Sequence, residues 1–165
     1  MKCISSMFSD KHVDTKENST NNQTSESKTI TITSDECVKR VNKIKQEFKD
    51  SDLFSESTKY CDSEEVIRMC NLEKFKDISC IALIDEHDDE YQEVVVVASP
   101  HKEDYDELLR SMILRYQSLK EEYKDKYDEE LKTAEDISIR QEYGVVSFII
   151  SKNVLKVLNV IRSSR

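Results

Sequence analysis

A change in composition at Thr33 constrains this chain more than any other feature of its sequence. Residues 1–33 are dominated by Ser, Thr, Asn, Lys and acidic residues, whereas the later sequence alternates between helix-like and strand-like apolar patterns. The polar segment buries too little apolar surface to offset the entropy lost on ordering. We therefore expect a disordered leader over residues 1–33. Residues 34–165 are expected to form a single domain, long enough for a core without disulfides.

Two segments after the leader carry the start signals of helices. Thr33 and Glu36 have the spacing of a capping box, in which each side chain hydrogen-bonds the backbone N–H of the other residue. Asp62 and Glu65 repeat this spacing before a shorter apolar segment. The second helix is too short to be stable alone, so it must pack on the rest of the domain. The first helix is expected to carry one apolar stripe, made of Val38, Val41, Ile44 and Phe48.

The middle of the chain is typical of a β-hairpin. Residues 80–84 form a short apolar run, residues 85–90 form an acidic turn, and residues 91–98 form a second run that contains the consecutive valines 94–97. Consecutive β-branched residues favour a strand, and the lack of alternation indicates a central, well-covered one. A six-residue connection is compatible with antiparallel pairing of the two strands.

A long amphipathic helix is predicted after this hairpin. Ser99 and Pro100 signal its start, because serine caps helices and the missing N–H of proline does no harm in the first turn. Its apolar stripe runs to Tyr123, or as far as Tyr127. We expect Tyr116, Tyr123 and Tyr127 in the core with their hydroxyls at the rim, and the alternative is that they line a ligand groove.

The remaining sequence predicts one more strand and a closing helix. The strand covers residues 143–150 beside the lone Gly144, and Ser151 or Asn153 caps the helix. The predicted order is α-α-β-β-α-β-α, an α+β fold with a three-stranded sheet and helices largely on one face. Residues 29–33 would add a fourth, edge strand. If the second and third strands are parallel, their connection is expected to be right-handed.

Charge and composition exclude several functional classes. Acidic residues outnumber basic ones 34 to 25, for a net charge of −9, which argues against binding nucleic acid. The same charge disfavours an anionic membrane surface except through a covalent anchor. The chain has one Gly and one Pro, which excludes P-loop and dinucleotide fingerprints. No apolar run reaches about 18 residues, so no transmembrane helix is predicted.

The five cysteines do not form a metal or redox motif. Their number is odd and no C-x-x-C pair is present, so we expect small buried apolar residues. A disulfide between Cys61 and Cys70 is the alternative. A catalytic thiol would need a histidine partner, but the three histidines lie in polar surroundings. The remaining cysteines are Cys3, Cys37 and Cys80.

The acidic turn is the one candidate metal site. Asp85, Asp88 and Asp89 could offer carboxylate oxygens to a divalent cation. However, the turn lacks the spacing and the glycine of an EF-hand, and a charged hairpin tip also discourages edge aggregation. No catalytic residue and no cofactor is predicted.

Several segments between residues 34 and 161 carry a resemblance to a known family. They include the acidic lead into the valine strand at residues 92–97 and the apolar strand after Gly144, within residues 143–151. In layout these segments resemble bacterial lipoproteins common in Firmicutes, known as domain of unknown function 4358. The resemblance implies an envelope protein anchored by lipid, with the polar leader as a spacer, and it implies no activity. Cys3 is then the candidate for lipid attachment. The segments concerned are residues 72–78, 92–97 and 143–151, together with Arg115, Gln117, Tyr123, Tyr127 and Glu130.

Three functional hypotheses follow. The first is a non-enzymatic extracytoplasmic module that binds a protein, peptide or envelope component. The second is a cytoplasmic acidic protein that regulates a basic partner, as the net charge suggests. The third is an enzyme, for which the sequence supplies no convergent polar groups. A homodimer through a strand edge or the long helix is compatible with each of them.

Overall fold

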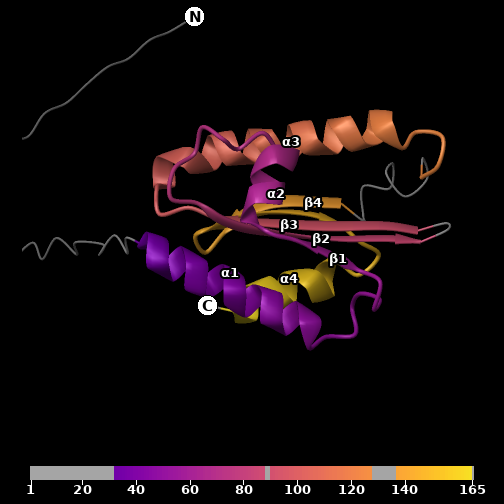
Figure 1. Cartoon of the computed structure of the whole chain (residues 1–165), viewed down its shortest axis with the longest axis horizontal. Helices are drawn as coiled ribbons and strands as arrows, with labels where there is room; N and C mark the ends of the chain where they lie inside the picture. The colour runs from indigo at the N-terminus through magenta and orange to yellow at the C-terminus, as the bar shows by residue number, and fades with distance from the viewer. Residues whose placement is uncertain (1–31, 88–89, 128–136, 165) are drawn as a thin grey trace, which may run out of the picture.

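The computed structural model describes residues 32–87, 90–127 and 137–164. The strands are β1 (Lys59–Cys61), β2 (Ser79–His87), β3 (Glu90–Ala98), β4 (Ile137–Glu142) and β5 (Val145–Ile150). The helices are α1 (Ser34–Lys49), α2 (Ser63–Met69), the 3-10 turn η1 (Lys102–Asp104), α3 (Tyr105–Glu122) and α4 (Val154–Ser163). The five strands form one sheet, seen nearly edge-on in Figure 1. Their order is β1-β2-β3-β5-β4, with all neighbours antiparallel.

The α+β class is confirmed, but the sheet is larger than the predicted three or four strands. The sequence-based prediction missed β1 and β4, which lie at the two edges of the sheet. An edge strand needs one neighbour and exposes one ladder, so it can be short and polar. β1 has three residues, and β4 carries Arg140 and Glu142. The predicted leader, Cys3 and the edge strand over residues 29–33 fall outside the described residues, except for Ile32 and Thr33.

Both predicted capping boxes are present. The Thr33 side chain accepts from the Glu36 N–H at the start of α1, and Asp62 accepts from the Glu65 N–H at the start of α2. Each glutamate carboxylate accepts in return from the N–H of its capping residue. Local sequence alone therefore places both helix starts correctly.

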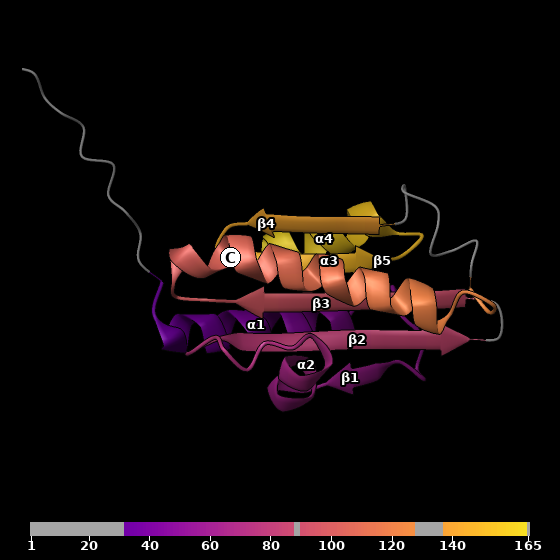
Figure 2. The same cartoon turned by 90° about the horizontal axis from the view of Figure 1, so that it is seen from above.

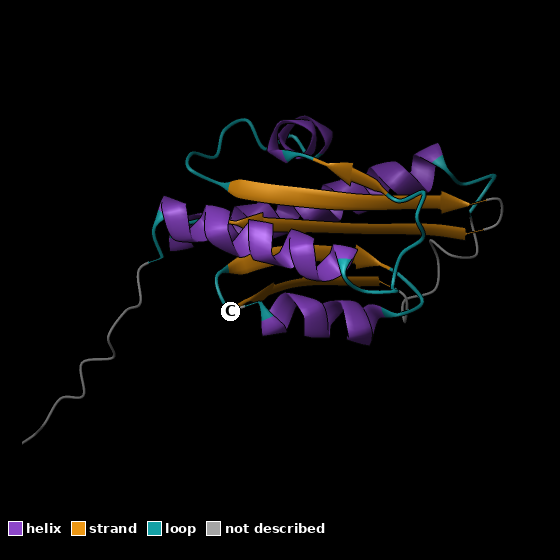
Figure 3. Ribbon diagram, turned by 60° about the horizontal axis from the view of Figure 1, so that its bottom comes forward, coloured by secondary structure: helices purple, strands orange, loops and turns teal. Residues whose placement is uncertain are grey.

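Helices cover both faces of the sheet, which corrects the expectation of helices largely on one face. Helices α2 and α3 lie on one face, with α2 over β2 and α3 over β5 and β4 (Figure 2). Helices α1 and α4 lie side by side on the opposite face (Figure 3). The four valines of β3 are each 0% exposed, which confirms the prediction of a central, well-covered strand.

Alternate residues of β3 supply two separate cores. Val95 and Val97 pack under α3, whereas Val94 and Val96 pack over α1 and α4. Successive side chains of a strand point to opposite faces, so a continuous run of valines contributes side chains to both cores. Tyr127 is fully buried in the first core, and Tyr116 and Tyr123 pack against it, so the core interpretation of these tyrosines is confirmed.

The β2–β3 hairpin is antiparallel as predicted, but its turn is shorter. Strand β2 continues to His87, and β3 begins at Glu90. Asp85 pairs in register with Gln92, and Glu86 pairs with Tyr91. Backbone pairing therefore extends through Asp85 and Glu86, although their charge had predicted that they belong to the turn.

The long helix begins later than predicted. Ser99 Oγ accepts from the His101 N–H at 3.1 Å and donates to the Asp104 carboxylate at 3.1 Å. These bonds close a tight turn that continues as η1, so α3 starts only at Tyr105.

Helix α3 also does not connect two neighbouring parallel strands. It precedes β4, which is parallel to β3 but is separated from it by β5, because both strands pair antiparallel to β5.

The closing helix begins at one of the two predicted capping residues, but without the expected side-chain bond. Asn153 occupies the N-cap position of α4 without a side-chain capping bond, and its N–H donates to Ser151 Oγ at 3.0 Å.

Among the residues that the structure describes, none of the helices combines the length and apolar content that a membrane span requires.

A buried ion pair joins α3 to the central strand. Glu93 of β3 is 0% exposed, and Arg115 donates to its two carboxylate oxygens at 2.9 and 2.8 Å. The Tyr91 hydroxyl also donates to Glu93. Burial raises the pKa of Tyr91, so this hydroxyl stays protonated as a donor. A carboxylate in this position is tolerated because three hydrogen bonds replace its water.

Replacement of Arg115 tests how far the fold depends on this pair. Arg115→Met leaves Glu93 buried without its cation, and we expect the free energy of unfolding to fall by about 3–5 kcal/mol. Urea unfolding followed by circular dichroism measures this loss. Glu93→Leu/Arg115→Met should recover part of it, because no charge is then left unpaired although the buried Tyr91 hydroxyl loses its acceptor. Arg110→Met, on the exposed part of the same helix, should change stability by less than about 0.5 kcal/mol. Equal effects of Arg110→Met and Arg115→Met would contradict this account.

Candidate functional site

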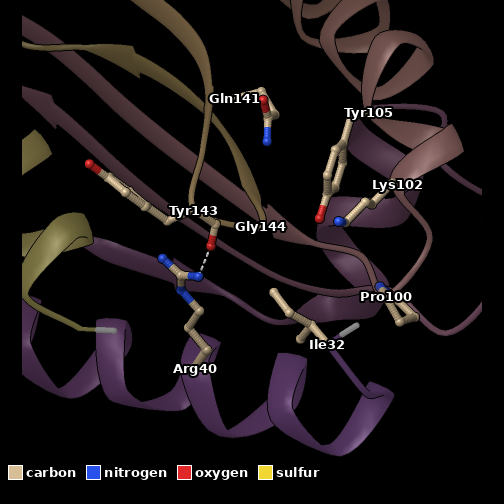
Figure 4. Close-up of a pocket in the computed structure, with 8 residues that line it drawn as sticks. All are labelled: Ile32, Arg40, Pro100, Lys102, Tyr105, Gln141, Tyr143 and Gly144. Atoms are coloured by element: carbon tan, nitrogen blue, oxygen red, sulfur yellow. Dashed lines mark hydrogen bonds between the residues drawn. The ribbon is translucent and has the colours of Figure 1, made fainter. Parts of the chain in front are cut away.

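A hollow of about 630 Å³ opens at one end of the sheet. Strand register places Ala98 beside Val145, and Val145 beside Glu142, so the end of β3 lies next to the β4–β5 turn. The N-terminal half of α1 and the start of α3 complete the walls (Figure 4). We call this hollow the Arg40 pocket. Its lining residues are Ile32, Arg40, Pro100, Lys102, Tyr105, Gln141, Tyr143 and Gly144.

The β4–β5 turn shapes one wall of the pocket. Tyr143 and Gly144 form a two-residue connection in which both residues have positive φ, 50° and 80°. Positive φ at both positions is typical of a type I′ hairpin turn, whose second position favours glycine. A Cβ at Gly144 would clash with Ile32 Cδ1 and lie 3.6 Å from the Tyr105 hydroxyl. The predicted third strand therefore begins at Val145, and residues 143 and 144 form the turn before it.

Two arginines hold this turn from different helices. Arg40 of α1 donates through Nη1 to the carbonyl oxygen of Tyr143. Arg162 of α4 donates to both carboxylate oxygens of Glu142 at 2.8 Å. The hydrogen bonds from Arg162 lower the pKa of Glu142, so this carboxylate stays ionised. The turn is thus fixed relative to the helices beneath the sheet.

The walls of the pocket offer hydrogen-bond donors beside apolar surface. Lys102 and Tyr105 lie across the hollow from Arg40, with Ile32 between them (Figure 4). The Tyr105 hydroxyl donates to the carbonyl of Ser99 at 3.1 Å, and burial raises its pKa, so it remains neutral. Gln141 adds an amide at the β4 side. Such a site suits a ligand with an apolar body and one polar group.

The pocket is positively charged within an acidic chain. Arg40 and Lys102 contribute two cations, and the described lining residues include no carboxylate, although the whole chain carries a net charge of −9. Two neighbouring carboxylates are engaged by other groups. Glu142 is paired with the cation Arg162, whereas Asp104 accepts from the neutral Ser99 hydroxyl and keeps its charge. The local field therefore favours an anionic ligand.

The structure places only one of the three candidate metal ligands. Asp85 is 2% exposed and lies in β2, where its oxygens accept from the backbone N–H of Ser55 at 3.0 Å and from the Ser55 hydroxyl at 2.8 Å. It thereby ties the loop after α1 to the sheet. Asp88 and Asp89 lie outside the described residues. Within the described ranges, no three His, Cys, Asp or Glu side chains form a group that could hold a metal ion.

The four described cysteines are free and buried. Cys61 and Cys70 are therefore not joined, and the disulfide alternative is not what the structure shows. Burial raises the pKa of Cys70 to about 12 and that of Cys80 to about 11. The thiolate is the reactive form of cysteine, so these two thiols are poor nucleophiles.

The sequence-based prediction did not identify the residues of the Arg40 pocket. They come from three stretches far apart in the sequence, residues 32–40, 100–105 and 141–144, and none was predicted to bind a ligand. One signal was present: Ile137, Ser138, Ile139 and Arg140 alternate apolar and polar residues just before Tyr143-Gly144. Alternation followed by a turn pair with glycine is typical of a hairpin. This pattern predicts the position of the turn, but it does not predict that Arg40 lies beneath the turn.

Comparison with known proteins adds no relative. Neither protein-family models nor curated proteins nor solved structures give a match to this chain. The resemblance described from the sequence therefore enters the functional argument below only as a proposal.

Replacement of Gly144 tests the geometry of the pocket wall. Gly144→Ala places a Cβ at positive φ and against Ile32, and we expect it to lower the free energy of unfolding by about 1–2 kcal/mol. Thermal unfolding followed by circular dichroism measures this. Tyr143→Asn is the matched control, because asparagine tolerates positive φ and should leave stability unchanged or raised. A Gly144→Ala variant as stable as the wild type would contradict the positive φ.

Alkylation tests the state of the buried thiols. At pH 8, native protein treated with iodoacetamide should remain unmodified at Cys70 and Cys80, because both are buried and protonated. In urea, both should react fully. Peptide mapping by mass spectrometry distinguishes the sites, and rapid alkylation of either cysteine in the native protein would overturn this assignment.

Proposed function

We propose that this chain is a non-catalytic binding module whose Arg40 pocket receives an anionic group carried on an apolar body, such as the C-terminal residue of a peptide. The observation that carries the proposal is that two cations, Arg40 and Lys102, line opposite sides of one hollow. Ile32, Pro100 and Tyr105 form other parts of its wall. A carboxylate would accept from Lys102 and be attracted by the charge of Arg40, whose Nη1 already donates to the Tyr143 carbonyl, while an apolar side chain lies against the remaining wall.

The chemistry of the lining residues supports binding rather than catalysis. Arginine, lysine, tyrosine and glutamine supply donors and charge. The described lining residues hold neither an imidazole nor a carboxylate to act as a general base, and no serine or cysteine to act as a nucleophile. A site of this composition can orient and retain an anion.

The setting of the module is a separate part of the proposal. The resemblance to domain of unknown function 4358 supports a place at the cell envelope, with residues 1–33 as a tether and Cys3 as the site of lipid attachment. Labelling of the producing cells with a radioactive fatty acid tests this. Label that is lost in Cys3→Ser supports the anchor, and an unlabelled protein in the soluble fraction contradicts it.

The four free buried cysteines favour a second candidate, a cytoplasmic acidic regulator of a basic partner. The net charge of −9 supports attraction to such a partner. The Arg40 pocket does not support this candidate, because its two cations would repel a basic segment of a partner. We therefore place this candidate second.

A matched pair of peptides tests the pocket. N-acetyl-Ala-Ala-Phe with a free carboxylate should perturb the backbone amide signals of Lys102 and Gly144 in ¹⁵N-labelled protein. The C-terminal carboxamide of the same peptide should bind about tenfold more weakly, because it lacks the charge. Binding of both peptides with equal affinity, or of neither, would refute the proposed ligand class.

Variants of the cations complete this test. Lys102→Met should weaken binding of the carboxylate peptide roughly two- to fivefold, as expected for an exposed cation. Arg40→Met should weaken it more, although this change also removes the bond to Tyr143. Lys124→Met removes an equal charge from an exposed position outside the pocket and should leave affinity unchanged.

A further inference from the structure

A second hollow adjoins the Arg40 pocket along α1. It has a volume of about 310 Å³ and is lined by Ile32, Glu36, Lys39, Arg40, Lys43 and Ser164. Ile32 and Arg40 line both hollows, so the two hollows form an adjoining pair along α1. We call this pair the α1 groove. Its second part lies between the N-terminal half of α1 and the end of α4.

The second part of the groove carries an excess of positive charge. Lys39 and Lys43 stand four residues apart, which places them on the same face of the helix as neighbours. Lys43 donates to the Ser163 carbonyl at 3.4 Å and forms an ion pair with Glu47 at 4.0 Å, which holds its side chain near the groove and offsets part of its charge. Like charges at this spacing disfavour a helix by themselves. Their position beside a hollow makes them suited to an anionic partner.

The one carboxylate that lines this part is engaged in capping. Glu36 Oε2 accepts from the backbone N–H of Thr33 at 2.7 Å and from its hydroxyl at 2.9 Å. The backbone hydrogen bond from Thr33 lowers the pKa of Glu36, so it stays ionised as part of the helix start. Across the whole groove, the described lining residues thus carry four cations and one carboxylate.

We infer that the α1 groove binds an acidic peptide in an extended conformation, with its C-terminal residue in the Arg40 pocket and two upstream carboxylates over Lys39 and Lys43. This inference rests on the proposed function and adds a rule for the sequence of the peptide. Four residues of helix rise by about 6 Å, and alternate residues of an extended chain repeat at roughly 6.6 Å. The spacing of the lysines therefore matches acidic residues two apart. A long polyanion fits less well, because its length beyond the groove would meet the surface of a net acidic chain.

Peptide sequence tests the rule directly. With the full chain at low salt, N-acetyl-Glu-Ala-Glu-Ala-Phe should bind about fivefold more tightly than N-acetyl-Gln-Ala-Gln-Ala-Phe, since two exposed ion pairs add modestly to affinity. The preference should shrink as salt is raised. N-acetyl-Glu-Glu-Ala-Ala-Phe should bind more weakly than the alternating peptide, because adjacent side chains point to opposite sides. Calorimetric titration measures all three.

Charge reversal in the groove identifies the site. Lys39→Glu/Lys43→Glu should abolish the preference for glutamate over glutamine peptides. Lys76→Glu/Lys124→Glu makes the same change in net charge at exposed positions outside the groove and should retain the preference. Circular dichroism of both variants verifies that the helices are intact.

The outcomes separate this inference from the proposed function. If the free carboxylate is preferred over the carboxamide but glutamate gives no advantage over glutamine, the Arg40 pocket stands and the extended groove is refuted. If the carboxamide peptides bind equally well, the proposed function fails first. If a dT₁₀ oligonucleotide binds as tightly as the acidic peptide, and loses affinity in Lys39→Glu/Lys43→Glu, the peptide specificity is refuted.

Discussion

Burial of strand β3 on both faces is the constraint on which the rest of this structure depends. The valines of residues 94–97 alternate between two cores, so each helical layer covers half of the same strand. Loss of either layer would expose apolar surface at a cost of about 25 cal/mol per Å². This arrangement also explains Glu93, because a carboxylate in a strand covered on both faces requires a cation from the helix above it. Arg115 of α3 meets that requirement.

The position of the Arg40 pocket follows from the same sheet. Antiparallel pairing brings the end of β3, the β4–β5 turn and the start of α3 to one end, where the strands stop and the helices above and below converge. The turn itself has little apolar surface to hold it. Hydrogen bonds from Arg40 and Arg162 fix it relative to α1 and α4. The wall of the pocket that this turn forms is thereby tied to two helices.

The distribution of charge makes the lining of the α1 groove positive although the chain is acidic overall. The chain is acidic overall, yet Lys39, Arg40, Lys43 and Lys102 gather along the groove. Net charge alone suggested a basic partner, because it averages over the whole surface. The local arrangement favours an acidic one, since electrostatic attraction at a binding site is set by the nearest groups and is screened beyond about 10 Å. The buried thiols and the tyrosine cluster contribute to the core instead.

The sequence by itself determined those features that depend on neighbours along the chain. Both capping boxes, the central valine strand, its hairpin partner and the amphipathic stripe of α3 follow from local spacing and periodicity. Only the tertiary structure decided the number of strands, the covering of both faces and the pairing of Glu93 with Arg115. It also decided the assembly of Arg40, Lys102, Tyr105 and the Tyr143-Gly144 turn into one pocket. Edge strands are short and polar, and groups that meet in a pocket are far apart in sequence. Their proximity depends on strand order and register, which local periodicity does not encode.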